Sequence, residues 1–200
     1  YGLTQGLLQI PFGAASDRIG RRPVIAAGLV IFAIGSFSAA CADSITGVIL
    51  GRALQGAGAI SAAVTALISD SVRERVITKA MAMVGASIGL TFALSLVIAP
   101  PLARLWGVPG IFALTGVLAA VALLVLWKLV PEAPRPHPDE HPHASWTRIA
   151  ADPQLLRLNF SIFALHAALT AMFVVVPTRL TALGLEPPEH WMAYLPAVLA

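Results

Sequence analysis

Charged residues are scarce in this chain: Asp, Glu, Lys and Arg make up 12% of its 200 residues, whereas hydrophobic residues make up 58%. A soluble globular domain carries about 25% charged residues. Lys and Arg are absent from five long stretches, at 24–42, 53–69, 80–103, 105–127 and 158–178. Because roughly 20 apolar residues in a helix cross the hydrocarbon layer, these stretches predict membrane-spanning helices. The chain is therefore expected to be an all-α, multi-pass membrane protein.

The chain is also poor in cysteine and lacks familiar catalytic motifs. Cys41 is the single cysteine, so no internal disulfide can form. The sequence has no G-x-S-x-G, no Walker loop, no H-E-x-x-H and no paired carboxylates within a span, so we expect neither an enzyme nor a cofactor. The net charge of +3 comes from bases at the ends of apolar runs, which is typical of a protein in a lipid bilayer and does not indicate nucleic-acid binding.

The distribution of Lys and Arg predicts the topology. The segments between successive apolar runs hold three, none, three, one, four and one of these residues: Arg18, Arg21 and Arg22; none around Asp43; Arg73, Arg75 and Lys79; Arg104; Lys128, Arg135, Arg148 and Arg157; and Arg179. Cytoplasmic loops of membrane proteins carry the excess of Lys and Arg. The first, third and fifth segments are therefore expected in the cytoplasm, with the chain in the inner (plasma) membrane.

Prolines and acids mark the expected helix starts. Pro23 suits the first position of a helix that begins near Val24. Asp152 precedes Pro153 in the same way and is the expected N-cap of the next long helix.

The segment 131–145 differs in kind, because it holds five prolines and three histidines (His137, His141 and His143). Proline at this density favours an extended, solvated linker. A metal site built from the histidines is the alternative, but a flexible segment offers no rigid support for such ligands. We therefore expect a linker and no metal site.

Asp17 and Asp70 stand at the cytoplasmic ends of two expected helices. A carboxylate at a helix C-terminus is disfavoured by the helix dipole. Contacts to arginines nearby, or to the N-terminus of a neighbouring helix, would compensate for this. Ordinary solvated charges at the membrane surface are the alternative.

Arg52 and His166 are titratable residues within expected spans. A charge inside the membrane costs roughly 2.5–3.5 kcal/mol at a helix centre, so Arg52 requires a partner. It shares a helical face with Gln55 and Gly56, which suits a packed interior. Two roles stay open for Arg52, tying neighbouring carbonyls together or coupling to protons. His166 could shuttle protons in a cavity or simply bond a facing helix.

Two motifs resemble those of the major facilitator superfamily. The turn Gly13-x-x-x-Asp17-Arg18-x-Gly20-Arg21-Arg22 is similar to the loop between its second and third helices, and Arg52-x-x-Gln55-Gly56-x-Gly58 is similar to its fourth-helix motif. The segments 1–5, 51–56 and 189–191 look most like the YajR-type branch, a group of proton-driven drug exporters. One departure is in helix 5, where 93–100 lacks the Gly-Pro pair of the family's antiporters.

The resemblance implies a fragment of a 12-helix transporter that is built from two six-helix halves. Residues 1–130 would be helices 2–6 of the N-terminal half, 131–153 the cytoplasmic linker, and 154–200 helix 7 with the start of helix 8. It also implies a conformational charge network of Gly13, Asp17, Arg18, Gly20, Arg21, Arg22, Asp70 and Arg75. Arg52, with Gln55 and Gly56, would couple protonation to the conformational change.

Three functions follow from this reading. The first is proton-coupled efflux of amphipathic, drug-like small molecules by a monomeric transporter that alternates access. The second is uniport or symport of sugars or other metabolites on the same fold. The third is a membrane-embedded binding or scaffold protein that has lost transport. Proton dependence of the flux separates the first two, and absence of any flux supports the third.

Overall fold

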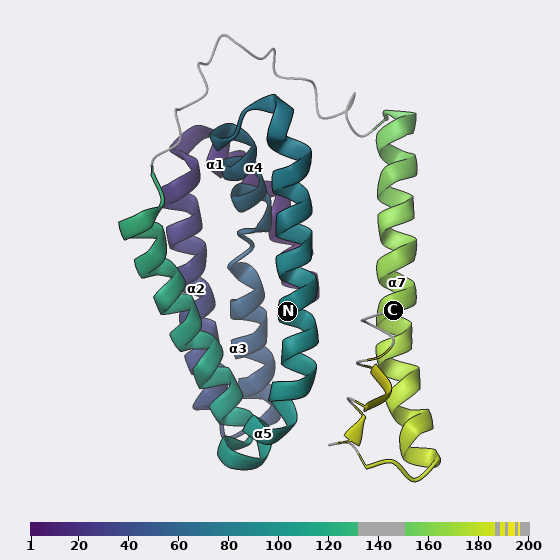
Figure 1. Cartoon of the computed structure of the whole chain (residues 1–200). Coiled ribbons are helices and arrows are strands. Elements are labelled where there is room, and N and C mark those ends of the chain that lie inside the picture. The colour runs from purple at the N-terminus through teal and green to yellow at the C-terminus, as the bar shows by residue number, and fades with distance from the viewer. Residues whose placement is uncertain (132–150, 187–188, 191, 195, 197–200) are drawn as a thin grey trace. The chain divides into compact units, whose positions relative to one another are not determined.

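The computed structural model describes residues 1–131, 151–186, 189–190, 192–194 and 196, and over these residues it contains helices and no strand (Figure 1). The helices are α1 (Gly2–Ile19), α2 (Arg21–Ala40), α3 (Ile45–Ala57), α4 (Ser61–Ser71), the 3-10 turn η1 (Glu74–Val76), α5 (Ile77–Leu129) and α7 (Pro153–Ala182). The chain divides into two compact units, Tyr1–Arg135 and Pro136–Ala200. The three linker histidines and their suggested metal site lie outside the described residues. The all-helical fold predicted from composition is confirmed.

A single glycine joins α1 to α2. Gly20 has φ 113° and ψ 151°, a backbone conformation that is essentially restricted to glycine. Because one residue completes this connection, α2 begins at Arg21 and Pro23 is the third helical residue. The prediction that Pro23 occupies the first helical position is therefore wrong. Proline is still accommodated, since the N–H groups of the first turn have no intrahelical partner.

The expected span at 53–69 is a broken helix. The sequence predicted one uninterrupted run at 53–69, but α3 starts at Ile45 and ends at Ala57, and α4 resumes at Ser61. Ser44 caps α3, since its side chain accepts a hydrogen bond from the Gly47 N–H at 3.1 Å. The break lies where the chain packs closely against α2, because a Cβ on Gly58 would collide with the Gly28 carbonyl oxygen.

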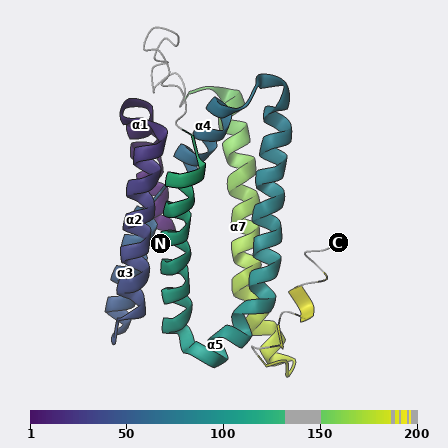
Figure 2. The ribbon, with the colours of Figure 1, turned by 60° about the vertical axis from the view of Figure 1, so that its left-hand side comes forward.

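α5 is a helical hairpin. Its 53 residues would reach about 80 Å at 1.5 Å per residue, far beyond the roughly 30 Å hydrocarbon core. Gly107 interrupts the helical geometry with φ 67° and ψ −178°, and Figures 1 and 2 show the ribbon reversing direction near the α5 label. The sequence placed this boundary at Arg104, but Arg104 continues the helix and the chain turns at the glycine.

The core of the first unit lies between α2, α4 and the last arm of α5. It contains the buried residues Val24, Ile25, Ala63, Leu67 and Leu126. α2 packs most extensively against α3 and α5, and Figure 2 shows the final arm of α5 beside it. This packing holds the ends of α1, α2 and α4 close together, where the charged turn is found.

α7 belongs to the second unit. Asp152 caps it as predicted, because its carboxylate accepts hydrogen bonds from the Gln154 and Leu155 N–H groups at 2.8 and 3.2 Å. Near its far end, the Phe173 ring stacks on Tyr194 with centroids 5.3 Å apart. Among the described residues, four helical stretches are long and apolar enough to cross a membrane: Arg21–Ala40, Ile45–Ser71, Glu74–Leu129 and Pro153–Ala182.

Candidate functional site: a charge network and an arginine among aromatic rings

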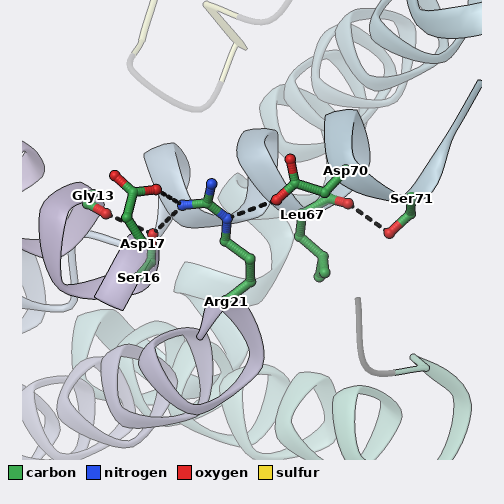
Figure 3. Close-up of polar contacts among 7 residues, drawn as sticks. All are labelled: Gly13, Ser16, Asp17, Arg21, Leu67, Asp70 and Ser71. Carbon is green, nitrogen blue, oxygen red and sulfur yellow. Dashed lines mark hydrogen bonds and ion pairs between the residues drawn. The ribbon is translucent and has the colours of Figure 1, made fainter. Parts of the chain in front are cut away.

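The charged turn converges on the guanidinium of Arg21. Its Nε donates to Asp70 Oδ2 at 2.9 Å, and its Nη1 donates to Asp17 Oδ1 and, at 2.7 Å, to Ser16 Oγ. Figure 3 shows Arg21 between the two aspartates, which come from the end of α1 and the end of α4. One side chain at the start of α2 thus joins three helix ends. Charge-assisted hydrogen bonds of this kind are stronger than neutral ones.

Ser16 is a member of this network that the sequence reasoning missed. The residue is 1% exposed, and its hydroxyl donates to the Gly13 carbonyl at 2.7 Å while accepting from Arg21. The signal available in the sequence was a hydroxyl residue directly before the acidic helix end. That signal is weak, because serine is common in packed membrane helices.

The two aspartates differ in exposure. The Asp70 side chain is 27% exposed and the Asp17 side chain is 62% exposed, whereas the Arg21 side chain is 13% exposed. An ion pair between exposed groups contributes little, because water screens it. The Arg21–Asp70 pair is therefore the stronger link of the network, and it connects residues 49 positions apart.

The other bases expected in the network lie elsewhere. Arg22 donates from Nε to the Leu126 carbonyl at 3.2 Å and from Nη2 to the Trp127 carbonyl. A cation bound to the last carbonyls of a helix is favourable, because it satisfies unpaired acceptors at the negative end of the dipole. Arg18 and Arg75 form no ion pair within the described part of the chain.

Arg52 lies among aromatic rings and a buried amide. Its Nη1 donates to Gln55 Oε1, which is one helical turn further along α3. The guanidinium carbon lies 4.7 Å from the centroid of the Tyr1 ring and 5.8 Å from that of Phe112, both distances typical of cation–π contacts. Gly56, the third residue of this motif, has no side chain to separate α3 from the Tyr1 backbone.

A cavity of about 350 Å³ adjoins this arginine site. Tyr1, Thr115 and the helix break at Gly58 form part of its wall, together with Gln5 and Phe32. Polar groups among apolar walls are typical of small-molecule sites.

His166 is in the other unit, where its Nδ1 lies 2.9 Å from the Ile162 carbonyl of its own helix. Within the described residues, no cluster of His, Cys, Asp and Glu could hold a metal ion.

The charge network around Arg21 and the site around Arg52 contain the residues of the two sequence motifs. Both lie in the first helical unit. The sequence family model described as Major Facilitator Superfamily matches residues 1–200. The chain belongs to the Major Facilitator Superfamily.

Several superfamily members resemble the chain. The inner membrane transport protein YajR of Escherichia coli (strain K12) is 46% identical over an aligned length of 210 positions, which covers 100% of this chain and 44% of YajR. An uncharacterized transporter of Buchnera aphidicola subsp. Schizaphis graminum is 34% identical over 202 residues, covering 100% of this chain and 52% of its own length. The multidrug transporter MdfA of Yersinia pestis bv. Antiqua (strain Angola) is 36% identical over 135 residues, 62% of this chain and 31% of MdfA.

The chain spans about half the length of the curated superfamily relatives that it matches over its whole length. The region aligned with YajR contains the positions of the charged turn and of the Arg52 motif, since it covers 100% of the chain. The likeness to MdfA covers a smaller share of this chain.

Proposed function

We propose that the chain is part of a secondary transporter that moves small molecules across an inner membrane by alternating access. The observation that carries this proposal is the bridge that Arg21 makes from Asp17 to Asp70. The inner membrane is proposed from the name of the E. coli relative YajR, and transport from the superfamily to which the chain belongs.

The charge network suits a conformational latch. A transporter with two conformations needs contacts in each that are absent from the other. The Arg21 bridge connects three helix ends through polar groups at a helix boundary, so it can break when those ends separate. Asp17, Arg21 and Asp70 would hold the cytoplasmic side closed in the outward-facing conformation. Ser16 and Gly13 would fix the position of Arg21, and Gly20 would fix the turn between α1 and α2.

We propose further that transport is proton-coupled efflux of amphipathic, drug-like compounds. The likeness to MdfA, whose name is multidrug transporter, supports this substrate class, and so does the mostly apolar wall of the cavity beside Arg52. Arg52 is half-buried against the Tyr1 and Phe112 rings, where a change of nearby charge has a larger electrostatic effect than in bulk water.

Transport of ethidium, a lipophilic cation, by the full-length protein in proteoliposomes tests the proposal. An imposed pH gradient should drive ethidium movement, and a protonophore should abolish it. Arg52→Ala should lower the rate at least about tenfold, because hydrogen bonds to charged groups contribute about 1.5–3 kcal/mol. Arg52→Lys should restore part of it, since lysine lacks the planar fork of donors.

Arg104→Ala is the matched control for this experiment. Arg104 is an exposed base on α5, remote from both motifs in the sequence, so its loss should leave ethidium movement unchanged. Ethidium movement that ignores the pH gradient would contradict proton coupling. No ethidium movement in correctly inserted protein, at any gradient, would contradict efflux of this substrate class.

A further inference from the structure

Three polar side chains from three helices meet beside Arg52. Gln55 on α3 is 1% exposed, and its Nε2 donates to Ser36 Oγ on α2 at 2.7 Å and to Thr115 Oγ1 on α5 at 3.5 Å. Ser36 is 0% exposed. Buried polar groups that satisfy one another fix side-chain positions, because any other arrangement leaves one of them unpaired.

The protons of both hydroxyl groups are already used. Ser36 Oγ donates to the Phe32 carbonyl at 2.7 Å, and Thr115 Oγ1 donates to the Phe112 carbonyl at 2.8 Å. Each hydroxyl has one proton, so toward Gln55 both can act only as acceptors. The nitrogen of the Gln55 amide must therefore face the two hydroxyls, and its oxygen must face the opposite way.

That oxygen is the acceptor for Arg52. If the amide were reversed, its N–H groups would point at a guanidinium that has donors only, and the bond would be lost. We infer that Ser36 and Thr115 are positioning residues, which orient Gln55 so that its oxygen holds the guanidinium of Arg52. This inference deepens the proposed function, on which its relevance to transport rests.

The surrounding backbone supports the same arrangement. Gly35 lies against α3 so closely that an added Cβ would collide with the backbone of Gln55, and this approach brings Ser36 within hydrogen-bond distance. On the other side, the carbonyl that holds Thr115 belongs to Phe112, whose ring contacts Arg52. One turn of α5 therefore supplies both an aromatic contact for the arginine and a hydroxyl for its amide partner.

The test is the side-chain NMR signal of Arg52 in the ¹⁵N-arginine-labelled full-length protein, assigned by its loss in Arg52→Lys. A guanidinium held over aromatic rings gives an upfield-shifted Nε–H proton. Ser36→Ala should move this signal toward the position of a free arginine, and Thr115→Val should move it less, since its hydrogen bond is longer. Thr115→Ser keeps the hydroxyl and should leave the signal in place.

Ser87→Ala is the matched control. The Ser87 hydroxyl donates to the Met83 carbonyl at 2.8 Å, as Ser36 does to Phe32, but it accepts from no glutamine in the described residues. Its loss should leave the Arg52 signal unchanged. An unchanged signal in both Ser36→Ala and Thr115→Val would overturn the inference, whatever happens to ethidium movement.

Ethidium movement in the same variants separates this inference from the proposed function. We expect Ser36→Ala to slow it about three- to tenfold, which is the scale of one buried hydrogen bond. A shifted Arg52 signal with unchanged ethidium movement would uphold the positioning role and contradict the transport role of Arg52.

Discussion

At the scale of single residues, the charge network is asymmetric. Arg21 is held by two carboxylates, but Asp17 is 62% exposed while Asp70 is 27% exposed. Exposed ion pairs typically contribute about 0.2–1 kcal/mol, and Asp17 also lies only four residues from Arg21. Asp70 joins the turn to a different helix. If the network is a latch, Asp70 should therefore contribute more to it than Asp17.

We predict that Asp70→Asn in the full-length protein shifts the conformational equilibrium toward the inward-facing form by about 1–3 kcal/mol, the usual scale of a coupling free energy. Asp17→Asn should shift it less. Spin labels at Glu74 and Gln154, read by double electron–electron resonance, would report the opening as a longer cytoplasmic distance. Asp43→Asn, an acid far from Arg21 in the sequence, should change nothing. A larger effect of Asp17 than of Asp70 would contradict the ranking.

Much of the charge network around Arg21, but not all of it, could be predicted from the amino-acid sequence. The dipole argument placed both aspartates near arginines, and the structure shows them on Arg21. Which arginine contacts the two aspartates depends on the direction in which α2 leaves Gly20, and the sequence does not determine that direction. Ser16, Ser36 and Thr115 were missed because a hydroxyl in a membrane helix is ordinarily bonded to its own backbone.

At the scale of helices, runs without charge predicted the existence of spans better than their limits. Arg104 suggested where α5 divides, but a helix reverses where the backbone permits it, and that position is Gly107. The break between α3 and α4 gave only a weak sequence signal, Gly56 and Gly58, because the run without charge continues through it. The break lies at a close approach to the Gly28 carbonyl of α2, which is a tertiary contact. Asp152 was predictable because capping is local.

The turn at Gly20 should be the connection least tolerant of substitution. An alanine with φ 113° and ψ 151° would cost about 1–3 kcal/mol, since this region is essentially restricted to glycine. We predict that Gly20→Ala lowers the melting temperature of the detergent-solubilised full-length protein and weakens the Arg21 bridge. Ile19→Ala, one residue earlier on an exposed face, should have little effect. Equal melting temperatures for both variants would mean that the turn relaxes to another conformation.

At the scale of the whole molecule, the bases mark one end of the first unit. At the start of α2, Arg21 bonds Asp70 at the end of α4, and Arg22 bonds a carbonyl near the end of α5. The start of α2 and the ends of α4 and α5 therefore lie together. Cys41, which follows α2, is exposed and is at the far end of that helix from Arg21. If cytoplasmic loops carry the excess of Lys and Arg, the Arg21 end faces the cytoplasm and Cys41 faces outward.

Native Cys41 therefore serves as a reporter of orientation. In intact cells that express the full-length protein with every other cysteine replaced, a membrane-impermeant maleimide should label Cys41. A Cys41→Ser, Glu74→Cys variant moves the thiol to the exposed turn η1 at the Arg21 end, where it should react only after the cells are permeabilised. Cys41→Ser alone should remain unlabelled in both conditions. Labelling of Glu74→Cys in intact cells, with Cys41 protected, would reverse the orientation and place the Asp17–Arg21–Asp70 network on the outer side, where it could not close a cytoplasmic gate.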